Sequence, residues 1–342
     1  MHTIDALSVG AERNDNLKKA KLENGFYNII DGEKVAARKR LPVINPATGK
    51  QLAAVPDVDH ALLNKAISDA RNAFSGWGAV PFGRRKAILA CLLNKIDDHA
   101  DELSALLAAE QGGPLAQARW EIDLLTEAFG SVLMQMAPPE KEQDAQPIEQ
   151  ITKRYVPIDG SGAISRWNLP VILSFGKVLP ALLAGDSGVL RPSPFTPLTV
   201  LRISDYIRKL LPPGVFNVVT GGHDLWPRMK SHSGIDLITF TRSTSIGKPL
   251  SESADTLRPT TLEVGGNDSK AVADNDPEKI ALFGRIALVP VNCKPGRYGL
   301  ASTLFEILSF RPVRMRTQVL VWSLARKASN TFQSSGQTPS AV

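Results

Sequence analysis

Residues 162–193 read GAISRWNLPVILSFGKVLPALLAGDSGVLRPS, and this stretch decides the fold. Short apolar runs near 162–166 and 187–191 predict buried strands, and the longer apolar run near 169–184 predicts a helix. A strand, a helix and a second strand in this order are typical of two parallel strands joined by a crossover helix. We therefore expect an α/β fold.

The same alternation continues toward the C-terminus. Further strands are expected near 215–219, 236–240 and 269–273, and further helices near 197–211 and 244–255. This pattern predicts a parallel sheet with helices on both faces. Ligands of such sheets bind beyond the carboxyl ends of the strands, so residues that follow a predicted strand are the first candidates for a site.

The N-terminal part predicts a few strands and several packing helices. Strands are expected at 26–30 and 41–44, and helices from about Asp59 onward, including long amphipathic stretches at 83–110 and 115–137. Cys91 lies in the apolar run Ala90-Cys91-Leu92-Leu93, so we expect a small core residue there rather than a nucleophile.

Composition excludes several classes of protein. The chain has 342 residues, 43% hydrophobic and 22% charged, which is typical of a globular protein. Two cysteines and five histidines form no disulfide framework and no metal-binding spacing. Apolar runs are too short to cross a bilayer, and no apolar leader is visible, so we expect a cytoplasmic protein without membrane contact.

The positive charge is confined to the C-terminal tail. Residues 285–342 hold eight Lys or Arg and one acid, a net +7 (8 − 1), whereas residues 1–284 have a net −1 (32 − 33). A basic tail is compatible with nucleic-acid binding, but no binding motif or interleaved aromatic residues accompany these charges. We therefore expect no nucleic-acid partner.

Four motifs follow one another in register with the predicted strands. They are Trp167-Asn168-Leu169-Pro170, Arg191-Pro192-Ser193, Phe240-Thr241-Arg242-Ser243-Thr244 and Leu262-Glu263-Val264-Gly265-Gly266. Together with the N-terminal segments 27–32 and 45–49, they resemble the aldehyde dehydrogenase superfamily. The resemblance covers about residues 25–283 and implies a Rossmann-like, aldehyde dehydrogenase-like fold.

After Phe283 the resemblance ends, and the family's later Glu-x-Phe-Gly-Pro motif does not appear. We expect a truncated chain, or one with an altered reading frame, that lacks most of the catalytic domain. The expected organisation is a flexible leader (1–24), N-terminal strands and helices packing on the cofactor domain (25–150), a dinucleotide-binding α/β domain (151–283) and a divergent basic tail (284–342).

The resemblance implies three catalytic residues. Asn168 matches the asparagine whose amide donates to the oxyanion, and Glu263 matches the general base that activates water. Cys293 is the candidate nucleophile, although its surroundings lack the family's Gly-Gln. The alternatives are a loop or helix-cap asparagine, a solvated carboxylate and an incidental tail cysteine.

The resemblance also implies the residues that bind the cofactor. They are Ile164, Trp167, Asn168, Arg191, Ser193, Pro194, Gly221, Gly222, Arg242, Ser243, Thr244, Ser245, Ile246 and Gly247. A helix N-terminus after this last loop suits a pyrophosphate. Arg191 stands where the family commonly has Lys, which keeps a positive charge near the adenosine ribose. Arg242 replaces a glycine of the phosphate loop, where a cation either pairs with phosphate or obstructs it.

The implied reaction oxidises an aldehyde to a carboxylic acid with NAD, or alternatively NADP, through a thiohemiacetal on Cys293. The alternative is a catalytically inactive remnant that binds a dinucleotide or a partner, including an inactive subunit of a homo- or hetero-oligomer. The expected ligand is a small-molecule aldehyde, and the sequence leaves its identity and the pathway open.

Overall fold

The computed structural model describes residues 20–138, 142–145, 150–153, 156–242 and 260–264. A seven-stranded sheet forms the centre of this part of the chain. Its order is β11 (Thr260–Val264), β10 (Leu237–Arg242), β7 (Ser161–Ile164), β8 (Gly188–Arg191), β9 (Phe216–Val218), β1 (Asn28–Ile30) and β2 (Glu33–Val35). The strands from β11 to β9 are parallel, and β1 and β2 continue the sheet in antiparallel pairing.

The connections create a topological switch point in this sheet. From β7 the chain passes through α7 (Pro170–Ala184) to β8 and then through α8 (Leu198–Ile207) to β9. It then returns through α9 (Leu225–Ser231) to β10, which pairs with the opposite edge of β7. The strand order therefore reverses at β7, which has β8 on one side and β10 on the other, and α/β sheets form a crevice for ligands at such a point.

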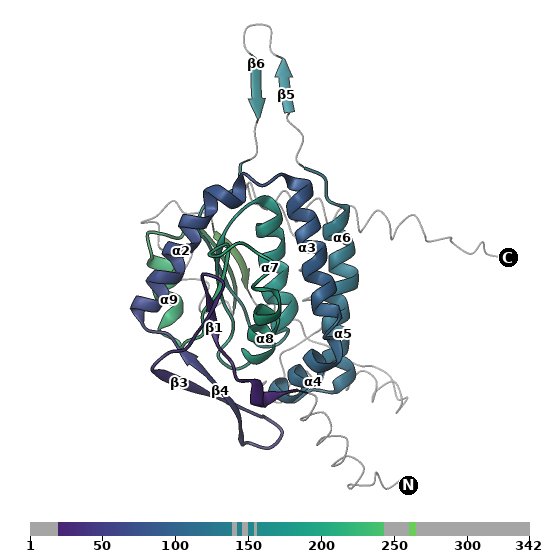
Figure 1. The fold of residues 1–342 in the computed structure, drawn as a ribbon, viewed down its shortest axis with the longest axis vertical. Helices are drawn as coiled ribbons and strands as arrows, with labels where there is room; N and C mark the ends of the chain where they lie inside the picture. The colour runs from purple at the N-terminus through teal and green to yellow at the C-terminus, as the bar shows by residue number, and fades with distance from the viewer. Residues whose placement is uncertain (1–19, 139–141, 146–149, 154–155, 243–259, 265–342) are drawn as a thin grey trace, which may run out of the picture.

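Helices cover both faces of the sheet, as the sequence predicts (Figure 1). One face is covered by α2 (His60–Gly78) and α9, which share a core with Ile164, Val189 and Ile238. On the other face α7 and α8 lie under a second layer. That layer consists of α3 (Phe82–Asp97), α4 (Ala100–Gln111), α5 (Leu115–Asp123), the π-helix η2 (Leu124–Phe129) and α6 (Gly130–Gln135).

The central helix α7 is apolar except at Ser174 and the half-buried Lys177, because it is covered on both sides. It packs on β7 and β8 and beneath α3 and α5, and Phe175, Leu179 and Leu183 are fully buried. Pro170 begins the helix, where its missing N–H costs nothing, and Gly185 ends it in the left-handed conformation with φ of 104°. The prediction of a helix near 169–184 is confirmed.

The N-terminal strands are short hairpins. Asp31 and Gly32 join β1 to β2 with φ of 55° and 72°, as a type I′ turn requires. Two further hairpins pair β3 (Lys39–Ile44) with β4 (Gln51–Asp57) and β5 (Glu142–Ala145) with β6 (Gln150–Lys153). The β5–β6 hairpin projects from the body in Figure 1.

Three expectations need correction. The end of the expected flexible leader is packed: Leu22–Asn24 form the 3₁₀-helix η1, and Ala20 is buried. The stretch 83–110 is two helices, since α3 ends at Asp97 and α4 begins at Ala100. Cys91 is exposed rather than buried, because the helix turns about 100° per residue and places it opposite the face of Leu89 and Leu92.

Two predicted elements, the helix at 244–255 and the strand at 269–273, lie outside the described residues. The described helices include none that is long and apolar enough to cross a membrane.

Candidate functional site

Three loops that carry predicted site residues, those after β7, β8 and β9, meet at the carboxyl edge of the parallel strands. The loop after β7 joins the end of β8 through the Ser165 N–H, which donates to the Arg191 carbonyl (3.2 Å). It joins the loop after β8 through Thr196 Oγ1, which donates to the Trp167 carbonyl (3.4 Å). The loop after β9 follows, since the Val219 N–H donates to the Leu190 carbonyl (3.0 Å). The predicted convergence of these loops is thus present.

The segment that carries Asn168 is held by α4. Gln111, the last residue of that helix, donates from Nε2 to the carbonyl oxygens of Asn168 (3.0 Å) and Trp167 (3.4 Å). Asn168 Oδ1 is buried, and it has no hydrogen-bond partner among the described residues. A buried amide oxygen without a partner is costly, and contact with a ligand is one explanation for such a group.

Asn168 does not cap α7, because a carboxylate from α5 already fills that role. Glu121 Oε1 accepts from the backbone N–H groups of Val171 (2.8 Å) and Ile172 (3.1 Å). The N-cap residue is Leu169, which makes no side-chain capping bond. The helix-cap alternative for Asn168 is therefore wrong. Burial raises the pKa of Glu121 to about 8, against the lowering effect of these hydrogen bonds.

A second buried carboxylate holds the start of α8. Glu110 accepts from the N–H groups of Leu198 (2.7 Å) and Thr199 (2.9 Å), and burial raises its pKa to about 7. Glu110 and Gln111 are neighbours, so one helix end holds both the α8 start and the Asn168 segment. Loops of the α/β unit are thus positioned by helices encoded far upstream.

Arg191 directs its charge inward. Its side chain is 1% exposed, and Nη2 donates to the carbonyl oxygens of Gly221 (3.0 Å) and Gly222 (2.8 Å). Asp57, at the end of β4, accepts from the Gly222 N–H (3.2 Å). The expected placement of this charge at a ribose does not fit a guanidinium that is buried against loop carbonyls.

The remaining cofactor candidates differ in how they face the edge. The Ile164 side chain is buried in the core beneath α2 and α9, so only its backbone can contact a ligand. Ser193 is buried and uses Oγ to accept from the Phe195 N–H (3.3 Å), which forms a local turn. Pro194 and Trp167 are half-buried.

The last two motifs are described in part. In the parallel pairing of β10 and β11, Thr241 lies opposite Glu263 and Arg242 lies opposite Val264. Glu263 is thus placed on the strand next to β10, near its carboxyl end. Residues 243–247 and Cys293 lie outside the described residues, so these predicted contacts stay predictions.

Sequence reasoning missed four residues that shape this edge, namely Glu110, Gln111, Glu121 and Asp57. One signal was available for the two glutamates, because each lies on the apolar stripe of its helix. Glu121 continues the stripe of Ala118 and Ile122, which are both buried. A carboxylate on a buried stripe requires partners, and helix N-termini supply them.

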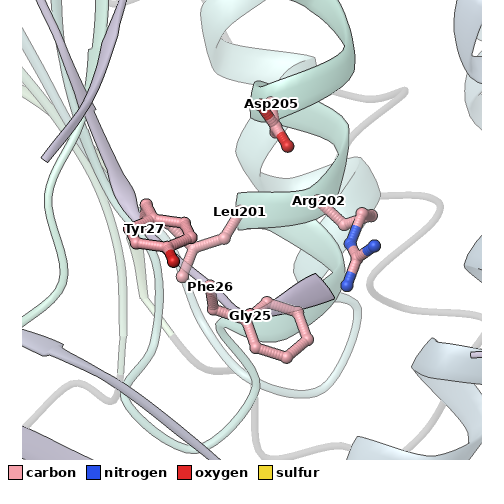
Figure 2. A pocket seen from close by; sticks show the side chains of 6 residues that line it. All are labelled: Gly25, Phe26, Tyr27, Leu201, Arg202 and Asp205. Atoms are coloured by element: carbon pink, nitrogen blue, oxygen red, sulfur yellow. The ribbon is translucent and has the colours of Figure 1, made fainter. Parts of the chain in front are cut away.

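None of the predicted site residues lines the shallow pocket shown in Figure 2. That pocket is formed by Gly25, Phe26, Tyr27, Leu201, Arg202 and Asp205. Its buried cation is already used, since Arg202 contacts Glu102 (3.2 Å) and donates to the Lys21 carbonyl (2.9 Å). The described residues also contain no cluster of three metal-ligating side chains.

Comparison with known proteins supports these observations. The sequence profile of the aldehyde dehydrogenase family matches residues 33–281. Aminoaldehyde dehydrogenase 1, peroxisomal, from Malus domestica is 34% identical over 268 residues, which are 74% of this chain and 53% of that protein. A 3,6-anhydro-alpha-L-galactose dehydrogenase from Streptomyces coelicolor is 36% identical, over 66% of this chain and 47% of that protein.

Solved structures give the same result. An E. coli NADP dependent enzyme is 32% identical, with a TM-score of 0.65 over 71% of this chain and 52% of that one. Betaine aldehyde dehydrogenase from Staphylococcus aureus, in complex with NAD+, shares the fold at 24% identity, with a TM-score of 0.73 over 80% of this chain and 56% of that one. The chain spans about half the length of these relatives. With its sequence profile, its sheet order and its motif loops in agreement, the chain belongs to the aldehyde dehydrogenase family.

Proposed function

We propose that this chain binds NAD, with NADP as the alternative, at the carboxyl edge of β7, β8 and β9 and oxidises an aldehyde to a carboxylic acid. The observation that carries the proposal is the state of Asn168. Its backbone is fixed by Gln111, its capping role is taken by Glu121, and its buried Oδ1 has no described partner. The orphaned Oδ1 is an acceptor, so it marks a side chain that the fold leaves unused, and the role at an oxyanion falls to the Nδ2 N–H donors of the same amide.

The residues at this edge fit a dinucleotide in two respects. Gly221 and Gly222 leave the loop after β9 without side chains, so a ligand can approach its backbone closely; a Cβ on Gly221 would also lie 2.7 Å from Leu225 Cδ2 of α9. The half-buried Trp167 and Pro194 lie in the neighbouring loops after β7 and β8. When bound, the nicotinamide would accept the hydride from the substrate. Two relatives named for NADP and NAD+ support this cofactor class.

The chain's own residues would divide the remaining chemistry. Cys293 would add its thiolate to the carbonyl carbon, and the Asn168 amide would donate to the oxygen that becomes negative. After hydride loss leaves a thioester, Glu263 would take a proton from water, which then releases the carboxylic acid and the free thiol. The roles of Glu263 and Cys293 rest on family resemblance, as does the expectation of oligomers. The domain division and the cytoplasmic location also remain predictions.

Turnover of an aldehyde panel tests this function. Aminoaldehydes and betaine aldehyde, the substrates named for relatives, would be assayed with NAD+ and NADP+ by absorbance of the reduced nicotinamide. We expect Asn168→Ala to lower kcat by about 100-fold, the scale of losing one oxyanion donor. Cys293→Ala should abolish turnover. Asn64→Ala, on the exposed face of α2, should leave turnover unchanged.

Two results would contradict the proposal. Cofactor binding without turnover of any aldehyde would favour the inactive, dinucleotide-binding alternative. Equal turnover by wild type and Asn168→Ala would show that the Asn168 amide takes no part in the reaction.

A further inference from the structure

The loop after β9 is held from two directions by residues that are far apart in the sequence. From the N-terminal strands, Asn28 Oδ1 accepts from Thr220 N (2.8 Å), and the Val58 N–H donates to the Thr220 carbonyl (3.0 Å). Asp57 accepts from Gly222 N, and Arg191 reaches the loop from β8. The glycine pair 221–222 lies at the centre of this arrangement.

Arg191 and Asp57 form hydrogen bonds to the same peptide unit. The peptide that joins Gly221 to Gly222 carries the Gly221 carbonyl oxygen and the Gly222 N–H. Arg191 donates to that oxygen (3.0 Å), and Asp57 accepts from that N–H (3.2 Å). The oxygen and hydrogen of a trans peptide point in opposite directions, so two partners on opposite sides fix the peptide plane. A cation at the oxygen and a carboxylate at the hydrogen also match the peptide dipole.

These two hydrogen bonds matter because glycines allow the backbone many conformations. Two successive glycines can adopt many conformations, and close approach of a ligand needs only one of them. Arg191 also donates to the Gly222 carbonyl (2.8 Å), which fixes the next peptide. The buried guanidinium thus removes the freedom that the missing side chains allow.

We propose that Arg191 and Asp57 are positioning residues that fix the Gly221–Gly222 peptide so that the loop meets the dinucleotide in one orientation. The proposal rests on the proposed function, because it assumes a dinucleotide at this edge. It assigns the Arg191 charge to the loop and not to the 2′-phosphate of NADP. Arg191 therefore affects NAD+ and NADP+ equally.

Calorimetric titration of the full chain with NAD+ and NADP+ tests this assignment. We expect Arg191→Met and Asp57→Ala each to raise both Kd values by the same factor, about tenfold. Arg191→Lys and Asp57→Asn keep a donor and an acceptor and should recover part of the affinity. The double variant should lose less than the product of the single losses, since both side chains act on one peptide.

Hydrogen exchange provides a readout without a ligand. We expect exchange across residues 219–224 to accelerate in Arg191→Met and Asp57→Ala, with the melting temperature reduced too little to unfold the protein at the assay temperature. Arg208→Met is the matched control, because Arg208 also donates to a glycine carbonyl, that of Gly32 (2.8 Å), at the turn between β1 and β2. It should leave both the loop exchange and the Kd values unchanged.

The outcomes separate the possibilities. A loss of affinity confined to NADP+ would show that Arg191 contacts the 2′-phosphate, which overturns the proposal. Unchanged hydrogen exchange in the loop would show that the two side chains do not fix the peptide, which also overturns it. Faster exchange with unchanged Kd values would make the pair merely structural, which also overturns it. Failure of the wild type to bind either dinucleotide would instead refute the proposed function, and the cofactor role of the pair with it.

Discussion

Glu121→Gln should remove a loss of folding stability that grows as the pH rises. The folded chain holds the Glu121 proton up to a pKa of about 8, whereas the ordinary value is 4.5. Between these values the native state binds more protons than the unfolded state, so the free energy of unfolding falls as pH rises. The difference of 3.5 pKa units (8 − 4.5) corresponds to at most about 5 kcal/mol.

The glutamine keeps an oxygen that can accept from Val171 and Ile172, and it carries no charge. Urea unfolding followed by tryptophan fluorescence at about pH 5.5 and about pH 8.5 measures the effect. At the lower pH, which is one unit above 4.5, the variant should be more stable than wild type by only about 1 kcal/mol. At the higher pH the variant should be more stable by several kcal/mol, with about 5 as the upper bound. Glu121→Ala should be less stable than Glu121→Gln at both, because it leaves two helix N–H groups without a partner.

Glu33→Gln is the control, since Glu33 is exposed and its hydrogen bond from Lys209 lowers the pKa of its carboxyl. A lowered pKa contributes stability that is fully present above the ordinary value of 4.5. Both assay pH values lie above 4.5, so Glu33→Gln should change the free energy of unfolding by the same amount at both. The reasoning is refuted if wild type and Glu121→Gln differ by the same amount at both pH values, or if wild type gains relative stability at the higher one.

Two further predictions concern single side chains. Cys91 should react with a thiol reagent in the native Cys293→Ala protein as fast as it does in urea, because it is exposed on α3; protection until unfolding would contradict its placement. Gln111→Ala removes both donors from the Trp167 and Asn168 carbonyl groups, so steady-state assays should show kcat lowered by about tenfold. An unchanged kcat would show that Gln111 does not position Asn168.

The sequence predicted the elements that combine apolar runs with clear ends. The helix expected near 169–184 is α7 almost to the residue, because its run begins at Pro170 and ends before Gly185. By contrast, α9 went unnoticed, since the short segment Leu225–Ser231 has no apolar periodicity. The antiparallel strand β2 was missed for a similar reason, because it has only three residues and two of them are exposed.

For the site, topology was predictable but side-chain direction was not. The rule that parallel strands end on one edge brought the Trp167, Arg191 and Gly221 loops together correctly. The residue type of Arg191 suggested a ligand contact, whereas only the fold shows that its guanidinium turns inward. The support from Glu121 lies about fifty residues upstream of α7 in sequence, beyond the reach of local patterns.

Hydrogen exchange of the full chain with and without saturating NAD+ tests the central claim most directly. The account predicts slower exchange in three loops, residues 165–168, 192–196 and 219–222, which follow β7, β8 and β9. Protection confined to other segments, or no protection by NAD+ or NADP+, would contradict a dinucleotide site at this edge of the sheet.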